Sequence, residues 1–377
     1  MTRESSPYSR REFLKTTALI ATVAAMGNAQ ETAKKPKFPF VDGLCLDFLE
    51  EPSEIKASGL TAFLTDMSKA ESVPTADGSP RWTRTLAVTM KNMVAARQAL
   101  RKRSDSFLAT SGTQIKDAFK SGKTAVFFQV QGGGEIVGED LSRIDLLSEL
   151  GLRVLQITHH DNNPLGGGGL EKVTTGLTKL GFEAVEIINS LNIIPDLSHS
   201  SDQTGLDTLK TSKKPVILSH GAARALVNNA RCAPDEVIRG IADSGGVMGI
   251  FMMSFWLTND AVPTVDSLIS QIRHVIKVGG IDAVGIANDF PLSGEQSLVE
   301  LKNNNAEGVK SYLPWWTSRA KMGVLGFERT PQHVVIPELN NISRMQTIYD
   351  SLKRSGFSSG QLQKIMGGNW IRVLSTF

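Results

Sequence analysis

Two histidines follow short apolar runs at matching points of the sequence. Asp-Leu-Ser-His at 196–199 ends one run, and Ile-Leu-Ser-His at 217–220 ends the next. A lone histidine at a strand end is usually a capping or core residue. Here, however, His199 and His220 are separated by the length of one strand-and-helix repeat. Because neutral imidazole is a common ligand of zinc and iron, we expect the two side chains to converge on one metal ion.

Two further polar residues occupy the ends of apolar runs. Asp289 closes the run 283–289, where it is a metal ligand, a general base or the N-cap of the next helix. His159 ends the run 153–159, and we expect His160 in the loop that follows. Four separate runs therefore end in side chains that are able to do chemistry.

These positions need a fold that brings strand ends together. Apolar runs alternate with amphipathic stretches from residue 39 onward, which is typical of a parallel sheet covered by helices. Helical periodicity is clear at 141–150 and 178–191. The nine apolar runs are 39–48, 59–66, 107–111, 124–131, 153–159, 192–199, 215–220, 247–253 and 283–289. The run 107–111 is the shortest and most polar, so we place it outside the sheet. We predict an α/β protein with a (β/α)8 TIM barrel, in one domain over residues 30–377.

The first 29 residues follow a different pattern. Arg10 and Arg11 precede Glu-Phe-Leu-Lys and an apolar run at 16–26, which is shorter than the ~20 residues of a membrane span. Small residues at 27–29 offer a cleavage site after Ala29. We predict a twin-arginine signal peptide over residues 1–29 and a periplasmic mature protein without a stable membrane span. The alternatives are an uncleaved anchor and a chance basic helix.

Composition narrows the classes of partner. The 377 residues include 41 Lys or Arg and 38 Asp or Glu, which gives a net charge of +3 without a long run of one sign. The chain lacks the electrostatic pattern of a protein that binds nucleic acid or anionic membranes. Two cysteines are too few for a disulfide scaffold. A Cys45–Cys232 disulfide and a homodimer both remain open.

Several segments together resemble the membrane (renal) dipeptidase family of metallopeptidases. The segments that match in the family's order are Thr-His-His-Asp-Asn-Asn (158–163), Asp-Leu-Ser-His (196–199), Ser-His-Gly-Ala-Ala-Arg (219–224), Gly-Ile-Ala-Asn-Asp-Phe (285–290) and the closing stretch 356–373. The resemblance extends from about Val41 to the end of the chain. It implies an amidohydrolase-like barrel with two zinc ions that cleaves dipeptides, some β-lactams and related amides.

Matched position by position, the resemblance gives roles to five side chains. His199 and His220 match two ligands of one zinc ion, and Asp289 matches a carboxylate on the other. His159 matches the histidine that stabilises the tetrahedral intermediate. Arg231 matches the group that binds the carboxylate of the substrate.

The same resemblance shows where this chain departs from the family. The family's first strand reads Asp-Gly-His-x-Asp, but Leu44 and Leu46 replace both ligands here, and Gln131 replaces the bridging glutamate. Two neighbouring dications repel, and these neutral side chains cannot supply the negative charge that offsets the repulsion. We therefore expect one ion, zinc or iron, held by the two histidines and either Asp289 or Gln131. Strand alternation directs Cys45 away from the site, toward the helices.

Three functions remain open from the sequence. The first is a metal-dependent hydrolase of a dipeptide or small amide, in which Asp289 transfers the proton, His159 stabilises the oxyanion and Arg231 binds a carboxylate. The second is a non-hydrolytic periplasmic barrel that binds or matures a small exported metabolite. The third is a purely structural protein, which explains the polar strand ends least well. The aromatic segment 311–316 is either a loop over the barrel mouth or packing for the C-terminal helices.

Overall fold

The computed structural model describes residues 37–46, 52–74 and 80–376. The chain divides into Met1–Pro36 and Lys37–Phe377, and all described residues belong to the second part. The predicted signal peptide, residues 1–29, lies outside the described residues.

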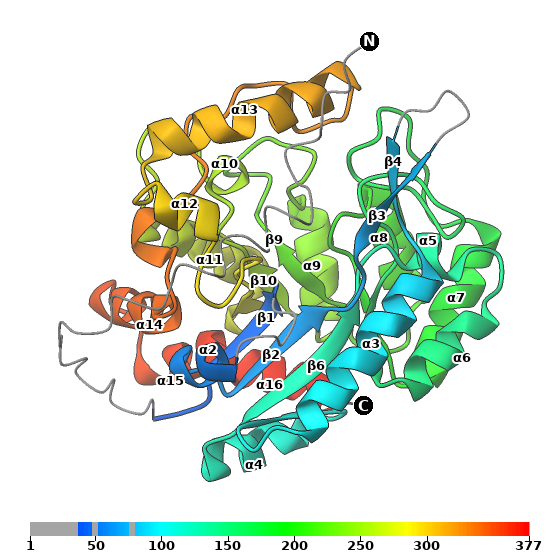
Figure 1. The fold of residues 1–377 in the computed structure, drawn as a ribbon, viewed down its shortest axis with the longest axis horizontal. Coiled ribbons are helices and arrows are strands. Elements are labelled where there is room, and N and C mark those ends of the chain that lie inside the picture. Colours follow the sequence, from blue (N-terminus) through cyan, green and yellow to red (C-terminus); the bar gives the residue numbers. More distant parts are fainter. Residues whose placement is uncertain (1–36, 47–51, 75–79, 377) are drawn as a thin grey trace, which may run out of the picture. The chain divides into compact units, whose positions relative to one another are not determined.

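Parallel strands form the centre of the described part (Figure 1). They are β1 (Val41–Cys45), β2 (Ala62–Asp66), β6 (Thr124–Val130), β7 (Leu152–Gln156), β8 (Ile194–Asp196), β9 (Leu218–Gly221), β10 (Met248–Ile250) and β11 (Val284–Ile286). The first five pair in the order β1-β2-β6-β7-β8, and the last three pair as β9-β10-β11. Two parallel bridges join these two groups of strands, one at each edge. They connect Asp196 with Ile217 and Cys45 with Phe290. The strands thus close into a ring, which confirms the predicted TIM-like barrel.

Each predicted apolar run contributes a strand. The run 107–111 forms β5 (Ser106–Leu108), which pairs with β6 but lies off the path of the ring, as predicted. The sequence does not predict the antiparallel hairpin of β3 (Ala70–Pro74) and β4 (Pro80–Arg84). Its short strands are rich in charged and polar residues, so they give no apolar signal.

Helices cover the outside of the barrel, and two of them match the predicted helical stretches. These are α6 (Ser142–Glu149) and α7 (Lys179–Ser190). Thr178 caps α7, because its hydroxyl accepts the backbone N–H of Gly181 at 3.0 Å. The other α-helices are α2 (Pro52–Ala57), α3 (Leu86–Arg101), α4 (Thr113–Ser121), α5 (Gly133–Val137), α8 (Asp202–Thr211), α9 (Asp235–Asp243), α10 (Ser254–Leu257), α11 (Val265–Gly279), α12 (Gln296–Glu300), α13 (Asn305–Lys321), α14 (Arg344–Arg354), α15 (Ser359–Gln363) and α16 (Asn369–Leu374).

Strand side chains alternate between two apolar layers. On β2, Phe63 packs in the layer shared with the helices, whereas Ala62 and Leu64 pack inside the barrel. On β1, Cys45 belongs to the outer layer and Leu44 to the inner one. The direction predicted for Cys45 is therefore confirmed. Both cysteines are buried thiols, and no disulfide joins them.

Trp370 of α16 fills the interior of the barrel below the functional strand ends. Its side chain is fully buried, and its indole N–H donates to the carbonyl of Ile286 at 3.0 Å. Gly43, Gly249 and Gly285 lie so close to the indole that a Cβ at any of them would crowd it. Three strands therefore have glycine at the positions where a side chain would overlap the Trp370 indole.

The aromatic segment 311–316 lies in helix α13, not in a loop. Trp316 is buried, and its ring centroid is 4.7 Å from that of Phe327. Trp315 is 41% exposed. Trp316 therefore has the second of the two roles considered for this segment, which is packing.

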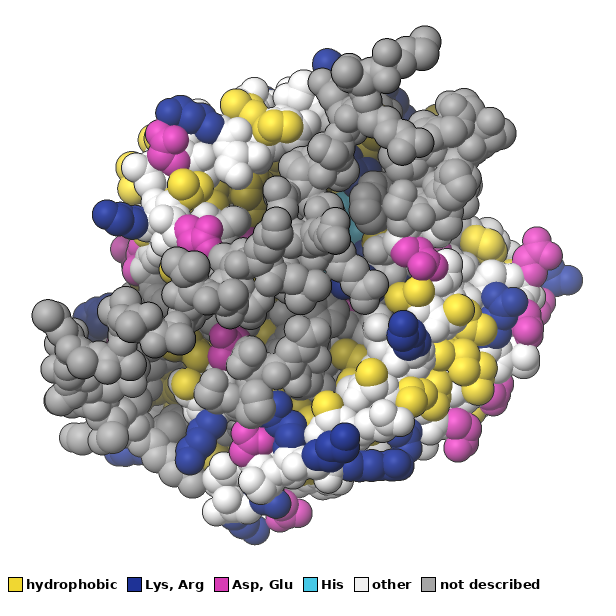
Figure 2. All heavy atoms as spheres, viewed as in Figure 1, with side chains coloured by type: hydrophobic (Ala, Val, Ile, Leu, Met, Phe, Trp, Pro, Cys, Tyr) yellow, Lys and Arg dark blue, Asp and Glu magenta, His cyan; other side chains and the backbone are white. Residues whose placement is uncertain are grey.

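The described surface carries mixed charge. Figure 2 shows Lys and Arg side chains interspersed with Asp and Glu over the described part of the face in view. In the ranges that the structure describes, no helix is both long and apolar enough to cross a bilayer.

Candidate active site

His199 and His220 meet at the ends of neighbouring strands. His199 follows β8 with a backbone φ of 67°, and His220 lies in β9. Their Nε2 atoms are 2.8 Å apart. Burial is the main cause that lowers the pKa of both imidazoles well below the usual value, and the charge of Arg231 adds to it. Both rings are therefore neutral, which is the form that binds metal.

A buried network fixes the proton on His220. Asp196 accepts the Gln129 amide at 2.9 Å and the Ser219 hydroxyl at 2.6 Å. Its other oxygen accepts the backbone N–H groups of Ser198 and Ser219. Because the single Ser219 proton goes to Asp196, the Ser219 oxygen accepts Nδ1–H of His220 at 2.9 Å. Nε2 of His220 then carries a lone pair.

Arg231 defines the protonation of the other ring. Its NH2 group donates to Nε2 of His199 at 3.0 Å and to the carbonyl of His220 at 3.2 Å. A guanidinium only donates, so Nε2 of His199 also presents a lone pair. Two lone pairs facing each other are favourable only with a cation or a donor beside them. Zinc–nitrogen bonds of about 2.0–2.1 Å hold two ligands about 3.3 Å apart, so the pair fits one metal ion after a small movement.

Asp289 places a carboxylate beside the two histidines. Its Oδ2 is 4.0 Å from Nε2 of His220, and its backbone φ is 58°. Burial raises the pKa of Asp289 to about 7, although the nearby Arg231 charge opposes the shift. Left-handed backbone at a residue other than glycine is uncommon and occurs often at functional sites. Both His199 and Asp289 have it.

Arg231 is a buried cation without a carboxylate partner. It is 5% exposed, and none of the ion pairs between described residues includes it. The guanidinium lies over the ring of Phe251, 5.2 Å from the centroid, and its Nε has no hydrogen-bond partner among the described residues. A buried charge is costly unless it is paired. An anionic group on a ligand would complete this pairing.

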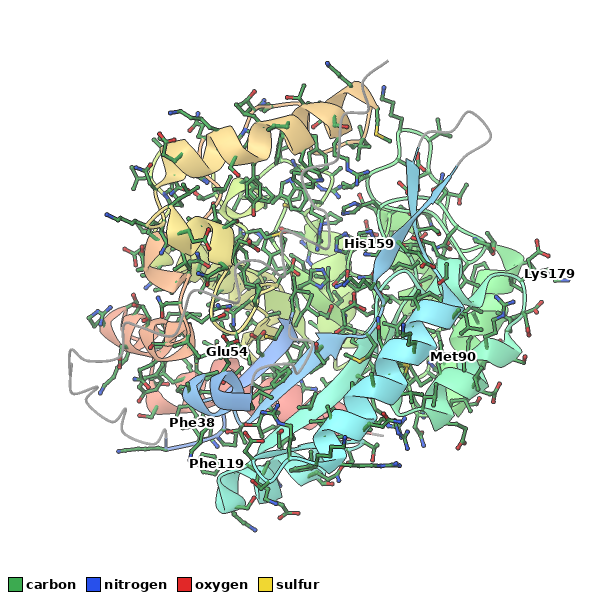
Figure 3. The ribbon with its side chains drawn as sticks, viewed as in Figure 1. Phe38, Glu54, Met90, Phe119, His159 and Lys179 are labelled. Atoms are coloured by element: carbon green, nitrogen blue, oxygen red, sulfur yellow. The ribbon has the colours of Figure 1, made fainter. Side chains whose placement is uncertain are left out.

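Two more histidines extend the cluster. The ring of His159 stacks on that of His199 with centroids 4.1 Å apart, and the ring of His160 lies 4.6 Å from that of His199. One nitrogen from each of these three rings lies within 4.8 Å of the other two. Figure 3 shows His159 near the centre of the described part. The structure thus gathers His159, His199, His220, Asp289 and Arg231 as the sequence predicts.

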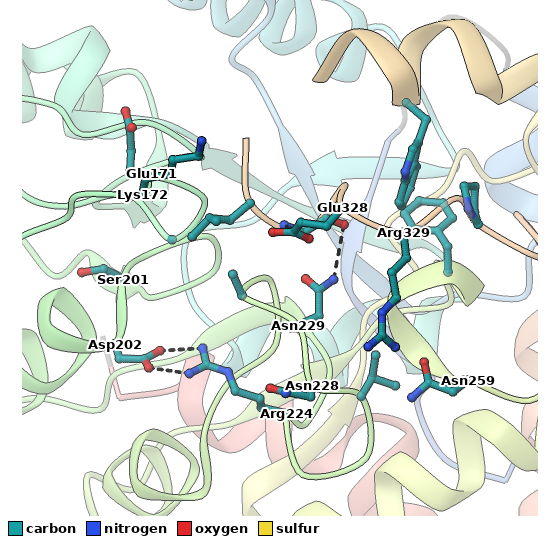
Figure 4. Close-up of a pocket in the computed structure, with 18 of the residues that line it drawn as sticks. Glu171, Lys172, Ser201, Asp202, Arg224, Asn228, Asn229, Asn259, Glu328 and Arg329 are labelled. Atoms are coloured by element: carbon teal, nitrogen blue, oxygen red, sulfur yellow. Dashed lines mark hydrogen bonds and ion pairs between the residues drawn. The ribbon is translucent and has the colours of Figure 1, made fainter. Parts of the chain in front are cut away.

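A cavity of about 1070 Å³, shown in Figure 4, is lined by residues close in sequence to the cluster, such as Ser201 and Ala230. In its wall, Arg224 donates to the two carboxylate oxygens of Asp202 at 2.5 and 2.8 Å. Phe255 and Trp316 give it aromatic surface, but the histidines described above do not line it. Cavity size alone therefore would not find the site, which is identified by its donor atoms.

Comparison with known proteins decides the family. A profile of the membrane dipeptidase family (Peptidase family M19) matches residues 52–308, which is more than half of the chain. The chain belongs to the membrane dipeptidase family. Proteins of this family are metal-dependent hydrolases, and this M19 chain is a hydrolase that carries the histidine cluster described above.

Solved structures share the fold of this M19 chain. An amidohydrolase from Pseudomonas aeruginosa is 24% identical, with a TM-score of 0.71 over 89% of this chain and 95% of that one. A metallopeptidase from Rhodobacter sphaeroides, liganded with a phosphinate mimic of the dipeptide L-Ala-D-Ala, is 18% identical, with a TM-score of 0.68 over 89% and 98%. The probable dipeptidase PvdM from Pseudomonas aeruginosa is 16% identical, with a TM-score of 0.69 over 90% and 95%.

The positions that the resemblance marks as departures from the family, Leu44, Leu46 and Gln131, lie in or directly after strands β1 and β6. Leu44 is fully buried in the inner layer, and its carbonyl accepts the backbone N–H of Asp289 at 2.9 Å. The side chain at position 44 thus lies in the inner layer, on a strand whose backbone bonds the backbone of Asp289. Gln131 donates its backbone N–H to Asp66 at 3.0 Å. Within the described residues, no hydrogen bond joins its side chain to a histidine of the cluster.

Sequence reasoning missed three polar residues near the site. Asp66 ends β2, so the rule applied to the other strand ends would have found it. Arg84 donates its Nε–H to the Ser68 hydroxyl at 3.2 Å, and that hydroxyl donates to Asp66 at 2.7 Å. Arg84 comes from the hairpin that the sequence does not predict. Asp196 stood in the quoted motif but received no role, because its network depends on the neighbouring strand.

Proposed function

We propose that this M19 protein hydrolyses a dipeptide or small amide with one zinc-type ion held by His199, His220 and Asp289. The observation that carries the proposal is the pair of histidine Nε2 atoms, 2.8 Å apart, with the Asp289 carboxylate 4.0 Å from Nε2 of His220. Two imidazoles and a carboxylate form a known protein site for zinc or iron. Gln131 is the alternative third ligand, but its described hydrogen bond points to Asp66.

The surrounding residues supply the rest of the chemistry. A bound zinc-type ion would acidify water and polarise the scissile carbonyl. Asp289 would transfer the proton, because its carboxylate lies 4.0 Å from Nε2 of His220, beside the place where the ion would hold water. His159 lies within reach as a neutral N–H donor for the developing oxyanion.

Arg231 gives the proposal its substrate class. Its buried guanidinium has no carboxylate partner within the described residues, so binding the carboxylate of a small peptide would remove an unfavourable charge. The R. sphaeroides metallopeptidase, which binds a dipeptide mimic, shares the fold. We therefore favour a substrate with a free carboxylate next to the scissile amide.

The test measures metal content and hydrolysis together. Purified protein should contain close to one zinc or iron ion per chain and hydrolyse a panel of dipeptides, and His199→Ala or His220→Ala should abolish both properties. His274→Ala is the matched control, because His274 lies on α11 and bonds Asp235 at 2.7 Å. A wild-type protein with neither metal nor hydrolysis would contradict the proposal and favour the non-hydrolytic metabolite-binding barrel.

We further propose export of a single-domain mature chain, residues 30–377, by the twin-arginine pathway. Arg10 and Arg11 support this, since the pathway recognises a paired arginine before a short apolar run. Changing both to Lys should leave folded precursor in the cytoplasm. Fractionation of cells that express the double variant checks this, and normal periplasmic accumulation would contradict it.

A further inference from the structure

The loop that carries Arg231 connects β9 to α9 and is folded back on itself. The backbone N–H of Arg224 donates to the carbonyl of Ala233 at 2.8 Å, and that of Ala233 donates to the carbonyl of Ala222 at 2.9 Å. A parallel bridge joins Ala223 with Ala233. The two ends of the loop therefore lie side by side, with Arg231 close to the returning end.

Arg231 itself lies between two anchored neighbours. Its backbone N–H donates to the side-chain oxygen of Asn229 at 2.9 Å, and the Asn229 amide donates to the carbonyl of Gly326 at 3.3 Å. On the other side, the carbonyl of Cys232 accepts Nε–H of Arg224 at 2.9 Å. The backbone at Arg231 is thus fixed from both sides, although its own Nε atom has no hydrogen-bond partner within the described ranges.

The guanidinium of Arg224 also reaches the segment that carries His199. It donates to Oδ2 and Oδ1 of Asp202 at 2.5 and 2.8 Å (Figure 4). Asp202 begins α8, three residues after His199. One side chain therefore binds both a carboxylate close to His199 in the chain and the carbonyl next to Arg231. A two-bond pair between arginine and a carboxylate fixes direction as well as distance.

The Arg224–Asp202 pair is too exposed to be a main source of stability. The two side chains are 27% and 45% exposed, and ion pairs at such positions stabilise a fold little. Both residues line the large cavity, together with Asn229 of the Arg231 loop. The main effect of the pair is therefore on the position of this loop, and hence of Arg231, and much less on the free energy of unfolding.

We propose that Arg224 and Asp202 are positioning residues for the group that binds the substrate carboxylate. Their pair holds the Arg231 loop against the His199 segment, so that the Arg231 guanidinium stays 3.0 Å from Nε2 of His199. Without the pair, the loop loses its bond to α8, and the position of the guanidinium relative to His199 is fixed less firmly. The inference rests on the proposed function for the role of Arg231 in binding a carboxylate.

The test compares a substrate that has a carboxylate with one that lacks it. The metal-loaded protein is assayed with L-Ala-D-Ala, or with the fastest dipeptide of the panel if L-Ala-D-Ala is not hydrolysed, and with the carboxamide of the same dipeptide. Asp202→Asn should raise KM for the dipeptide about fivefold with kcat nearly unchanged, because it weakens binding and not the chemical step. KM for the carboxamide should stay nearly unchanged. Asp202→Glu should restore most of the affinity, since it keeps the negative charge.

Asp105→Asn is the matched control. Arg103 donates to both carboxylate oxygens of Asp105 at 3.0 and 3.2 Å, but this pair precedes β5, at the opposite end of the strands from the site. The control should keep the wild-type KM for both substrates. Thermal unfolding of each variant checks folding. If Asp202→Asn does not fold, Arg224→Lys replaces it and must show the same rise in KM, confined to the dipeptide, for the inference to hold.

Arg231→Met separates this inference from the proposed function. If Arg231→Met loses the preference for the dipeptide while Asp202→Asn keeps the wild-type KM, the pair does not position Arg231 and the proposed function stands. If wild type hydrolyses no dipeptide, or if Arg231→Met keeps the preference, both are wrong. An equal loss with both substrates, or a loss in kcat alone, would show a general structural role of the pair and would also overturn the inference.

Discussion

The hydroxyl group of Ser219 lies 2.6 Å from Oδ2 of Asp196 and donates its only proton there. The Ser219 oxygen is thereby left to accept Nδ1–H of His220, which sets the tautomer of that ring. Metal-binding histidines are commonly oriented in this way, through a hydrogen bond on the nitrogen that does not bind the ion. The hydrogen bonds between Asp196, Ser219 and His220 therefore decide whether Nε2 of His220 carries the lone pair that a metal ion needs.

Ser219→Ala should weaken metal binding about 10–100-fold, as is typical when the hydrogen-bond partner of a histidine ligand is removed. The reason is that His220 loses the acceptor that holds its Nδ1 proton. Chelator competition with Zn²⁺ measures the effect. Ser254→Ala is the matched control, since Ser254 is also buried and bonds His333 at 3.0 Å, outside the cluster. Equal losses in both variants would indicate general destabilisation instead.

The sequence predicted the candidate ligands, but it did not predict the hydrogen bonds that orient them. His199, His220 and Asp289 each end an apolar run, so the period of the strands predicted where they would meet. The network around Asp196 depends on which hydroxyl of β9 faces which oxygen of β8. That pairing is set by sheet geometry, which no local pattern encodes.

The fold, too, could be predicted only in part from the sequence. Alternating apolar runs predicted the barrel, because parallel strands buried on both faces need continuous apolar stretches. The β3–β4 hairpin was not predicted, because its strands lack such apolar stretches. The position of Arg84, at the end of β4, was therefore not predicted either. The close approach of Gly168 and Gly169 to the backbone of His160 and His199 was not predicted either, because a lack of space for a Cβ appears only when distant segments pack together.

Stability should fall as pH rises through the titration of Asp42. This side chain is 1% exposed, and burial raises its pKa from 3.8 to about 6 although Asn288 donates to it at 2.6 Å. Between these pH values the folded state keeps a proton that the unfolded state has released. The contribution of Asp42 is thus greatest below pH 3.8, is lost as pH rises to about 6, and amounts to about 3 kcal/mol at most.

Urea unfolding of wild type and Asp42→Asn at pH 4 to 8 checks this expectation. The difference in unfolding free energy between the two proteins isolates Asp42 from the other buried carboxyl groups. Wild type should lose stability relative to the variant as pH rises from 4 to about 6, with little further change up to pH 8. A difference that does not change with pH would show that Asp42 titrates normally in the folded protein.

Trp370→Ala should destabilise the barrel by about 3–5 kcal/mol, as large aromatic truncations in a core do. The indole is fully buried against Gly43, Gly249 and Gly285, and these glycines have no side chains to fill the space it leaves. Urea unfolding measures the loss. Trp315→Ala is the control, because Trp315 is 41% exposed and should cost far less. Similar losses of unfolding free energy in the two variants would contradict the role of Trp370 as the side chain that fills the barrel interior.

The last prediction concerns the positions at which this chain departs from its family. Leu44→His, Leu46→Asp and Gln131→Glu together should add a second zinc ion, raise the content from one to close to two per chain and increase dipeptide hydrolysis. The carbonyl of Leu44 accepts the backbone N–H of Asp289 at 2.9 Å, so β1 runs next to the segment that carries the existing carboxylate. Leu44→His alone should bind no second ion and should lower stability, because it puts an unpaired polar group into the apolar interior. Metal analysis and a dipeptide assay of the single and triple variants test this. Two ions without added activity would mean that the shape of the substrate pocket limits hydrolysis, whereas no second ion would mean that positions 44, 46 and 131 do not correspond to the family's ligands.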